Sequence, residues 1–215
     1  INFYGFEGKQ DYMKAREYFE LAAKENNSEA LLYLGLIYSN GLGVKIDYIK
    51  ARNYYELSAK QNNSKALFNL GIIYYKGLDV EQDYLIAKEY FELAANQKNE
   101  YALLNLGNFY FYGFGVKQDY MKAFEYFELA AYQKNLEAIY NLGYLYSHGF
   151  GVKQDLLKAI KYYEIAAKQQ NNSNALLNLG IIYSKRLGVK KDYQKAMNYY
   201  ELAAEQNNSY AILNI

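Results

Sequence analysis

The stretch GFGVKQDYMKAFEYFELAA, residues 113–131, occurs three times in closely similar form along the chain. The other two copies are GLGVKIDYIKARNYYELSA at 41–59 and GFGVKQDLLKAIKYYEIAA at 149–167. The three starting positions differ by multiples of 36 residues. A period of this length is typical of supersecondary units stacked in a row, because each unit is too small to bury its own apolar faces.

Each unit of 36 residues contains two segments with helical periodicity. In the first complete unit these are ALLYLGLIY from Ala30 and DYIKARNYYELSA from Asp47. Apolar residues of the second segment recur at spacings of three, four, seven and eight, as in a helix with one buried face and a charged outer face. We therefore predict an all-α fold, an α-α superhelix (solenoid) of about six stacked 36-residue helix-turn-helix repeats.

The period also predicts where the repeats begin and end within a single array over residues 1–215. Residues 1–28 are interpreted as a partial repeat and 210–215 as the start of a further one, so we expect a fragment of a longer array. One repeat has an extra residue in its QQNNSN turn, which a loop absorbs at little cost. The full repeats are predicted at 29–64, 65–100, 101–136, 137–173 and 174–209.

An aspartate precedes the second helical segment of every unit. Its short side chain can accept hydrogen bonds from the free backbone N–H groups of the first helical turn. We therefore interpret these residues as helix N-caps and not as catalytic acids: Asp11, Asp47, Asp83, Asp119, Asp155 and Asp192.

Glycines are predicted to end the first helix of several units, at Gly41, Gly113 and Gly149, where the backbone turns left-handed. Asp79 replaces the second glycine of this loop in one repeat, and Arg186 replaces the first glycine in another. Asp tolerates the left-handed region better than Arg does, so we expect a locally rebuilt turn near Arg186.

Asn-Asn-Ser triplets separate several units, starting at Asn26, Asn62, Asn171 and Asn207. The first Asn suits a left-handed residue after one helix, and the second suits the N-cap of the next. The triplets also match the N-glycosylation sequon. We favour the structural interpretation because it accounts for their position between units.

A glycine also occupies the middle of each first helix, where it costs about 0.5–1 kcal/mol relative to Ala. Close packing of a neighbouring helix is the expected compensation. These residues are Gly35, Gly71, Gly107, Gly143 and Gly180.

Composition excludes several classes of function. Apolar residues make up 52% and charged residues 22%, which is typical of a folded chain. A net charge of +1 makes nucleic acid and anionic membranes unexpected partners. With no Cys and one His, we expect no disulfide, no metal site and no cofactor. We also expect neither a signal peptide nor a membrane span, and a cytoplasmic location.

The recurring residues Leu34-Gly35, Gly41, Asp47, Lys50-Ala51 and Tyr54-Tyr55 resemble the Sel-one-like repeat (SLR) family, related to tetratricopeptide repeats. The resemblance covers essentially the whole chain. It implies a superhelix of paired helices that serves as an adaptor or scaffold for protein complexes, without catalysis of its own.

By this resemblance, the first helices line an inner, concave surface that binds a protein or peptide partner. Large aromatic side chains favour such contacts. The alternative is that tight curvature packs these side chains into the core, and it remains open above all for Leu32, Leu36, Ile72 and Ile181. The candidate partner-binding residues are Phe68, Tyr75, Tyr101, Asn108, Phe111, Tyr112, Tyr140, Tyr144 and His148.

Two other functions remain open. The chain can be a structural spacer in a larger assembly, such as a cytoskeletal or ciliary complex, with contacts on its outer face. More remotely, it can be a regulatory repeat domain associated with an enzyme. We expect no catalytic residues, because Ser147 and His148 are adjacent on a helix and therefore point in different directions.

Overall fold

Helices form where the two periodic segments of each repeat predict them, in a computed structural model that describes residues 11–170, 172–185 and 190–215. Every regular element in these ranges is α-helix, which confirms the all-α prediction. The helices are α1 (Tyr12–Lys24), α2 (Ser28–Asn40), α3 (Tyr48–Ala59), α4 (Ser64–Lys76), α5 (Tyr84–Ala95), α6 (Glu100–Tyr112), α7 (Tyr120–Tyr132), α8 (Leu136–His148), α9 (Leu156–Gln170), α10 (Ser173–Ser184), α11 (Tyr193–Glu205) and α12 (Ser209–Ile212).

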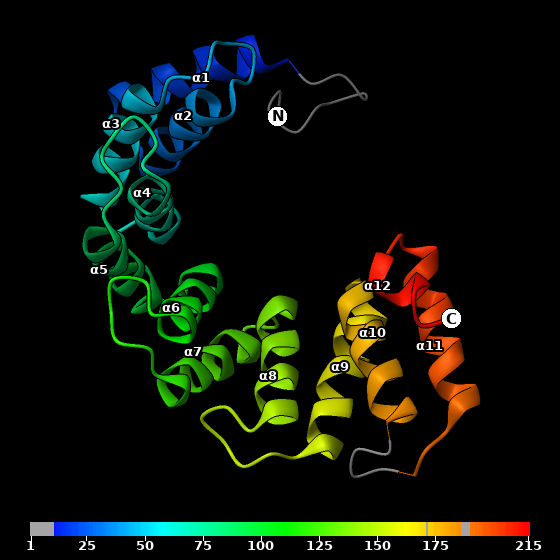
Figure 1. The fold of residues 1–215 in the computed structure, drawn as a ribbon. Coiled ribbons are helices and arrows are strands. Elements are labelled where there is room, and N and C mark those ends of the chain that lie inside the picture. The colour runs from blue at the N-terminus through cyan, green and yellow to red at the C-terminus, as the bar shows by residue number, and fades with distance from the viewer. Residues whose placement is uncertain (1–10, 171, 186–189) are drawn as a thin grey trace. The chain divides into compact units, whose positions relative to one another are not determined.

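The helices pack in chain order within two units, residues 1–102 and 103–215 (Figure 1). In the first unit α2 packs on α3 and α4 on α5, while α1 contacts α2 and α3 contacts α4. In the second unit α8 packs on α9 and α10 on α11, and α7 contacts α8. Within each unit, a helix pair therefore packs against the next pair in sequence, as expected of stacked repeats.

The aspartates before the second helices are N-caps, as predicted. Oδ1 of Asp119 accepts hydrogen bonds from the backbone N–H groups of Met121 and Lys122, both at 3.0 Å. The same contact recurs at the other five aspartates. These carboxylates therefore cap the start of the second helices, as the structural interpretation of the sequence requires.

The loop glycines also take the predicted conformation, with φ of 68° at Gly41, 76° at Gly113 and 72° at Gly149. Asp79 reaches a left-handed φ of 52° without being glycine. Arg186, where we expected a rebuilt turn, lies outside the described residues.

The paired asparagines between repeats take the two predicted roles, a left-handed residue followed by an N-cap. Asn62 is left-handed, with φ of 59°, and the Oδ1 atom of Asn63 accepts from the backbone N–H of Ala66 at 3.2 Å. Lys98 and Lys134 take the same left-handed conformation, with φ of 60° and 66°. The sequence did not reveal these two, because lysine has no particular preference for that region.

In five repeats, one ring of the second helix packs directly against the mid-helix glycine of the preceding first helix. A Cβ atom added at Gly107 would collide with the Phe127 ring, and one at Gly143 would come within 2.8 Å of the Tyr163 ring. Phe127 and Tyr163 are 1% and 0% exposed. This contact is the expected compensation for the glycine. The five pairs are Gly35 with Tyr55, Gly71 with Phe91, Gly107 with Phe127, Gly143 with Tyr163 and Gly180 with Tyr200.

We predict that Gly107→Ala lowers the free energy of unfolding by about 1–3 kcal/mol, because the new methyl group displaces the Phe127 ring. Alanine favours helix over glycine, so any loss must come from the tertiary contact. Urea unfolding of the variant, alone and combined with Phe127→Leu, measures this. An unchanged or raised midpoint for Gly107→Ala contradicts the prediction.

We predict that Asp119→Ala costs about 1 kcal/mol of stability, because the first turn of α7 loses its cap. Asp119→Ser is the matched control, since its hydroxyl can cap the same N–H groups without a full charge. The midpoint of thermal unfolding should fall less for Asp119→Ser than for Asp119→Ala. Equal falls would contradict the role of Asp119 as a cap.

Burial raises the pKa of the Tyr55 hydroxyl from 10.0 to about 12, although a hydrogen bond with Ser39 works against the shift. The folded pKa is the higher one, so the unfolded chain ionises first. The contribution of Tyr55, about 3 kcal/mol, is therefore complete below pH 10 and is lost as the pH rises to 12. Tyr55→Phe should make unfolding less steeply dependent on pH above about pH 10. Parallel urea-unfolding profiles for the two proteins would contradict this.

Candidate functional site

We call the exposed side of α2, α4, α6, α8 and α10 the first-helix surface. Its residues depend on which ring of the second helix packs against the mid-helix glycine. Where that ring is tyrosine, its hydroxyl forms a hydrogen bond with a serine of the first helix. The oxygen distances are 2.9 Å for Ser39 and Tyr55, 3.1 Å for Ser147 and Tyr163, and 3.0 Å for Ser184 and Tyr200.

In the two remaining full repeats the buried ring is phenylalanine, Phe91 or Phe127, and has no hydroxyl to satisfy. The equivalent first-helix positions carry Tyr75 and Phe111 in place of serine. At this one position the first helix can therefore carry an aromatic residue in these two repeats, because no polar partner is required there.

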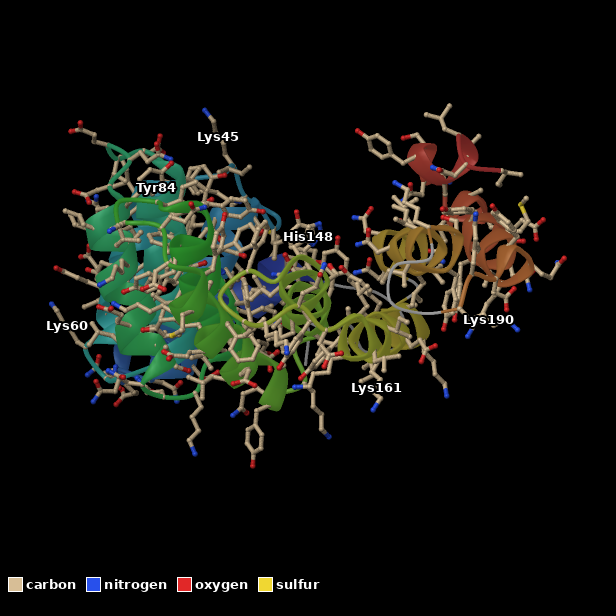
Figure 2. All side chains as sticks on the ribbon, turned by 60° about the horizontal axis from the view of Figure 1, so that its bottom comes forward. Lys45, Lys60, Tyr84, His148, Lys161 and Lys190 are labelled. Atoms are coloured by element: carbon tan, nitrogen blue, oxygen red, sulfur yellow. The ribbon has the colours of Figure 1, made fainter. Side chains whose placement is uncertain are left out.

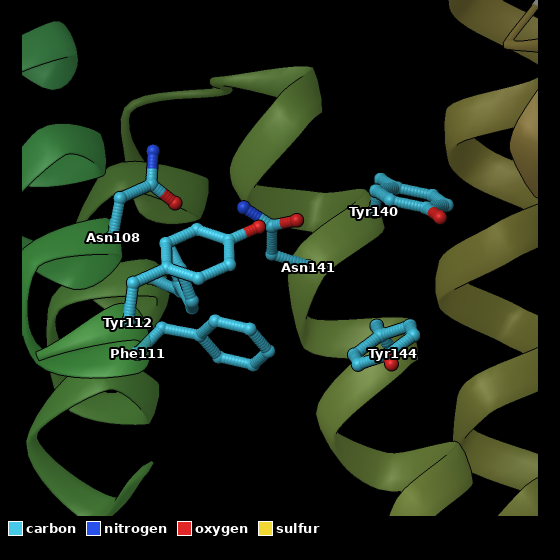
Figure 3. A pocket seen from close by; sticks show the side chains of 7 residues that line it. Asn108, Phe111, Tyr112, Tyr140, Asn141 and Tyr144 are labelled. Atoms are coloured by element: carbon cyan, nitrogen blue, oxygen red, sulfur yellow. The ribbon is translucent and has the colours of Figure 1, made fainter. Parts of the chain in front are cut away.

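A pocket lies between α6 and α8 in the second unit, with a volume of about 260 Å³ (Figure 3). It unites five of the predicted residues with two that the sequence did not single out, Phe127 and Asn141. The lining residues are Asn108, Phe111, Tyr112, Phe127, Tyr140, Asn141 and Tyr144.

The rings of this pocket stand at steep angles to one another. The Phe111 and Tyr112 centroids are 4.8 Å apart with 78° between the ring planes, and those of Phe111 and Tyr144 are 5.9 Å apart at 68°. His148 stacks on Tyr144 at 4.1 Å, just beyond the pocket lining. These aromatic residues therefore form one continuous cluster.

The tyrosines of the pocket differ in how freely they are exposed. Tyr112 is 60% exposed, whereas Tyr144 and Tyr140 are half-buried. Tyr140 also packs on Tyr163, with centroids 5.7 Å apart, and accepts a hydrogen bond from Asn178 at 3.3 Å. Burial is the main cause that raises the pKa of Tyr140. Tyr140 is therefore partly core, and Tyr112 is the more available contact.

Asn141 belongs to an Asn-Leu-Gly pattern that recurs in four first helices. Asparagine precedes the mid-helix Leu-Gly pair at Asn69, Asn105, Asn141 and Asn178. The side-chain amides of Asn108 and Asn141 have no hydrogen-bond partner in the described part of the chain. They are polar groups that a ligand in the pocket can reach.

The first unit contains another pocket, of about 470 Å³, that brings Phe68 and Tyr101 together with their ring centroids 5.8 Å apart. Lys65 and Lys98 also line it. Tyr75 is not in its lining and packs instead against Tyr84, with centroids 5.7 Å apart.

The alternative of core packing applies differently to the two leucines. Leu32 is 1% exposed and belongs to the core around Tyr55 and Leu70. Leu36 is half-buried and packs against that core. Both leucines line the pocket of the first unit, so they form its floor.

The expectation that Ser147 and His148 point apart was wrong. Ser147 Oγ lies 2.8 Å from His148 Nδ1, because both side chains fold back toward the carbonyl of Tyr144 at the end of α8. Ser147 Oγ also lies 3.1 Å from the Tyr163 hydroxyl. Within the described residues no Asp or Glu side chain hydrogen-bonds to either group, so the third member of a catalytic triad is not in place.

The described residues lack two further features. They contain no group of three or more His, Cys, Asp or Glu side chains arranged to hold a metal ion. No helix in these ranges combines the length and the apolar composition that a membrane crossing needs.

Known families and structures share this arrangement. The Sel1 repeat model matches residues 1–27, 28–63, 64–99, 100–135, 136–171 and 173–208. A Sel1 repeat protein from Oxalobacter formigenes is 34% identical, with a TM-score of 0.83 over 92% of this chain and 81% of that one. A search of the curated proteins finds no match.

Two other solved structures extend the comparison. A protective antigen of uropathogenic Escherichia coli strains, which displays an SLR fold, is 31% identical, with a TM-score of 0.68 over 98% of this chain and 52% of that one. An immunity protein from Pseudomonas aeruginosa is 21% identical, with a TM-score of 0.60 over 94% of this chain and 76% of that one. At that identity the likeness concerns the fold alone.

Proposed function

Because the chain belongs to the Sel1 repeat family, we propose that it is a non-catalytic adaptor that binds a segment of a partner protein in the pocket between α6 and α8. Protein interaction is a common role of Sel1 repeats, which supports the general assignment. The pocket between α6 and α8 is the specific binding site in this proposal.

One observation carries the proposal. Tyr112, 60% exposed, packs against Phe111 and lines the same pocket as Tyr144. A tyrosine so placed offers contact area and a hydroxyl group while losing little entropy on binding. The Phe68 and Tyr101 pocket is a second contact on the same kind of surface, within the single array that we propose for residues 1–215.

We predict that Tyr112→Ala combined with Tyr144→Ala lowers affinity for a partner peptide at least about tenfold, because truncating a central aromatic commonly costs 2 kcal/mol or more. Stability should change little, because Tyr112 is largely exposed and Tyr144 half-buried. The measurement selects peptides from a random display library on the 215-residue chain and compares their affinity for both proteins, alongside thermal unfolding.

The matched control is Tyr132→Ala, which removes a tyrosine that is 85% exposed at the end of α7, outside the pocket. It should leave peptide binding unchanged. If the double variant binds as the wild type does, or loses stability as much as affinity, the pocket is ordinary core and the adaptor proposal fails.

A structural spacer is the second candidate, and the second helices supply an observation in its favour. Lys60 and Lys161 project outward, as expected of a charged face (Figure 2). However, the second helices also expose apolar residues, and at one equivalent position all six do so, with between 41% and 58% of the residue exposed. These residues are Leu21, Leu57 and Leu93 in the first unit and Leu129, Ile165 and Leu202 in the second.

Such a row suits contacts with a neighbouring subunit better than a fully solvated face does. Substitution of Leu129 and Ile165 by Ser separates the two candidates. Under the adaptor proposal, peptide binding survives this change. Loss of assembly with unchanged peptide binding would assign the second helices a structural contact.

A further inference from the structure

The pocket between α6 and α8 is lined mainly by aromatic rings and carries no formal charge. Its lining contains five aromatic rings and two amides, and no Lys, Arg, Asp or Glu. Its volume of about 260 Å³ lies just below the roughly 300 Å³ at which small-molecule pockets begin. The pocket therefore suits one amino-acid side chain of a partner.

Phe111 contacts its neighbours in the pocket edge to face and not in parallel stacks. Phe111 meets both Tyr112 and Tyr144 edge to face, so neighbouring rings present differently oriented faces (Figure 3). An aromatic face carries partial negative charge and attracts a cation within about 6 Å of its centre. Several such faces around one small volume favour a positively charged occupant.

The chain itself shows this attraction elsewhere in the second unit. Lys158 Nζ lies 4.8 Å from the Tyr146 ring centre, and Lys122 Nζ lies 5.1 Å from that of Tyr110. In the described ranges no Lys or Arg lies over the rings of the pocket. His148 stacks on one face of the Tyr144 ring, and Phe114 stacks on one face of the Tyr112 ring. A cation of a partner would therefore use the ring surface that these two neighbours leave open.

The polar groups of the pocket disfavour a purely apolar occupant, and its ring faces disfavour an acidic one. The amides of Asn108 and Asn141 and the hydroxyl of Tyr112 offer oxygen atoms that accept hydrogen bonds. A purely apolar side chain would bury these groups without partners, at a cost of about 1–3 kcal/mol each. The amide N–H groups of Asn108 and Asn141 could donate to an acidic side chain, but its charge would meet the negative ring faces with no Lys or Arg in the lining to balance it.

From these contacts we infer that the pocket takes an arginine side chain of the partner segment, an inference that rests on the adaptor function proposed above. The guanidinium group is planar, stacks on aromatic faces and offers five donors. It is also more weakly hydrated than the lysine ammonium group, so it loses less on leaving water. An arginine can therefore contact the rings and the amide oxygens at the same time.

The test uses display-selected peptides that bind the 215-residue chain and Tyr132→Ala but not the Tyr112→Ala, Tyr144→Ala variant. Each should contain one arginine whose replacement by citrulline, a neutral isostere, weakens binding about tenfold. Replacement by lysine should weaken it less. The arginine peptide, and not the citrulline peptide, should shift the ¹⁵N signals of the Asn108 and Asn141 side-chain amides.

A pair of variants checks that the aromatic face is responsible. Tyr144→Phe keeps the ring and should keep the preference for arginine over citrulline, whereas Tyr144→Leu should lose it. Equal binding of the arginine, citrulline and leucine peptides overturns the inference and leaves the adaptor function standing. If no selected peptide depends on the pocket, the adaptor function itself fails.

Discussion

The contact between a buried ring and a mid-helix glycine is the constraint on which the remaining structure depends. It recurs in five repeats, from Gly35 with Tyr55 to Gly180 with Tyr200. Because the ring occupies the space of a side chain, the two helices of a repeat come close together, and their relative position tolerates little change. Glycine weakens the isolated helix, so the repeat depends on tertiary packing for its stability.

This contact also determines what the first-helix surface can carry. A buried tyrosine needs a hydrogen-bond partner and finds one in Ser39, Ser147 or Ser184. A buried phenylalanine has no such need, which allows Phe111 to replace the serine above Phe127. The buried ring of the second helix therefore influences which residue the first helix carries at its surface, although the two positions serve different purposes.

The resulting pocket differs from the scaffold that holds it. The scaffold repeats with a 36-residue period, whereas Asn108, Phe111 and Tyr112 form a combination that belongs to α6 alone among the first helices of the sequence. Repeat folds separate these roles because each unit needs only its packing residues to stack. The positions that remain are free to vary, and with them the partner that the surface selects.

The sequence alone determined the helices, their order and most of their caps. Period, caps and turn residues such as Asp119 and Asn63 act within a few residues of one another, so local physics is sufficient to predict them. Only the tertiary structure decided which aromatic residues face solvent. Tyr75, Tyr112 and Tyr140 look alike in sequence, but one packs on Tyr84, one borders a pocket and one is partly core. That distinction depends on residues from neighbouring helices, which local spacing does not report.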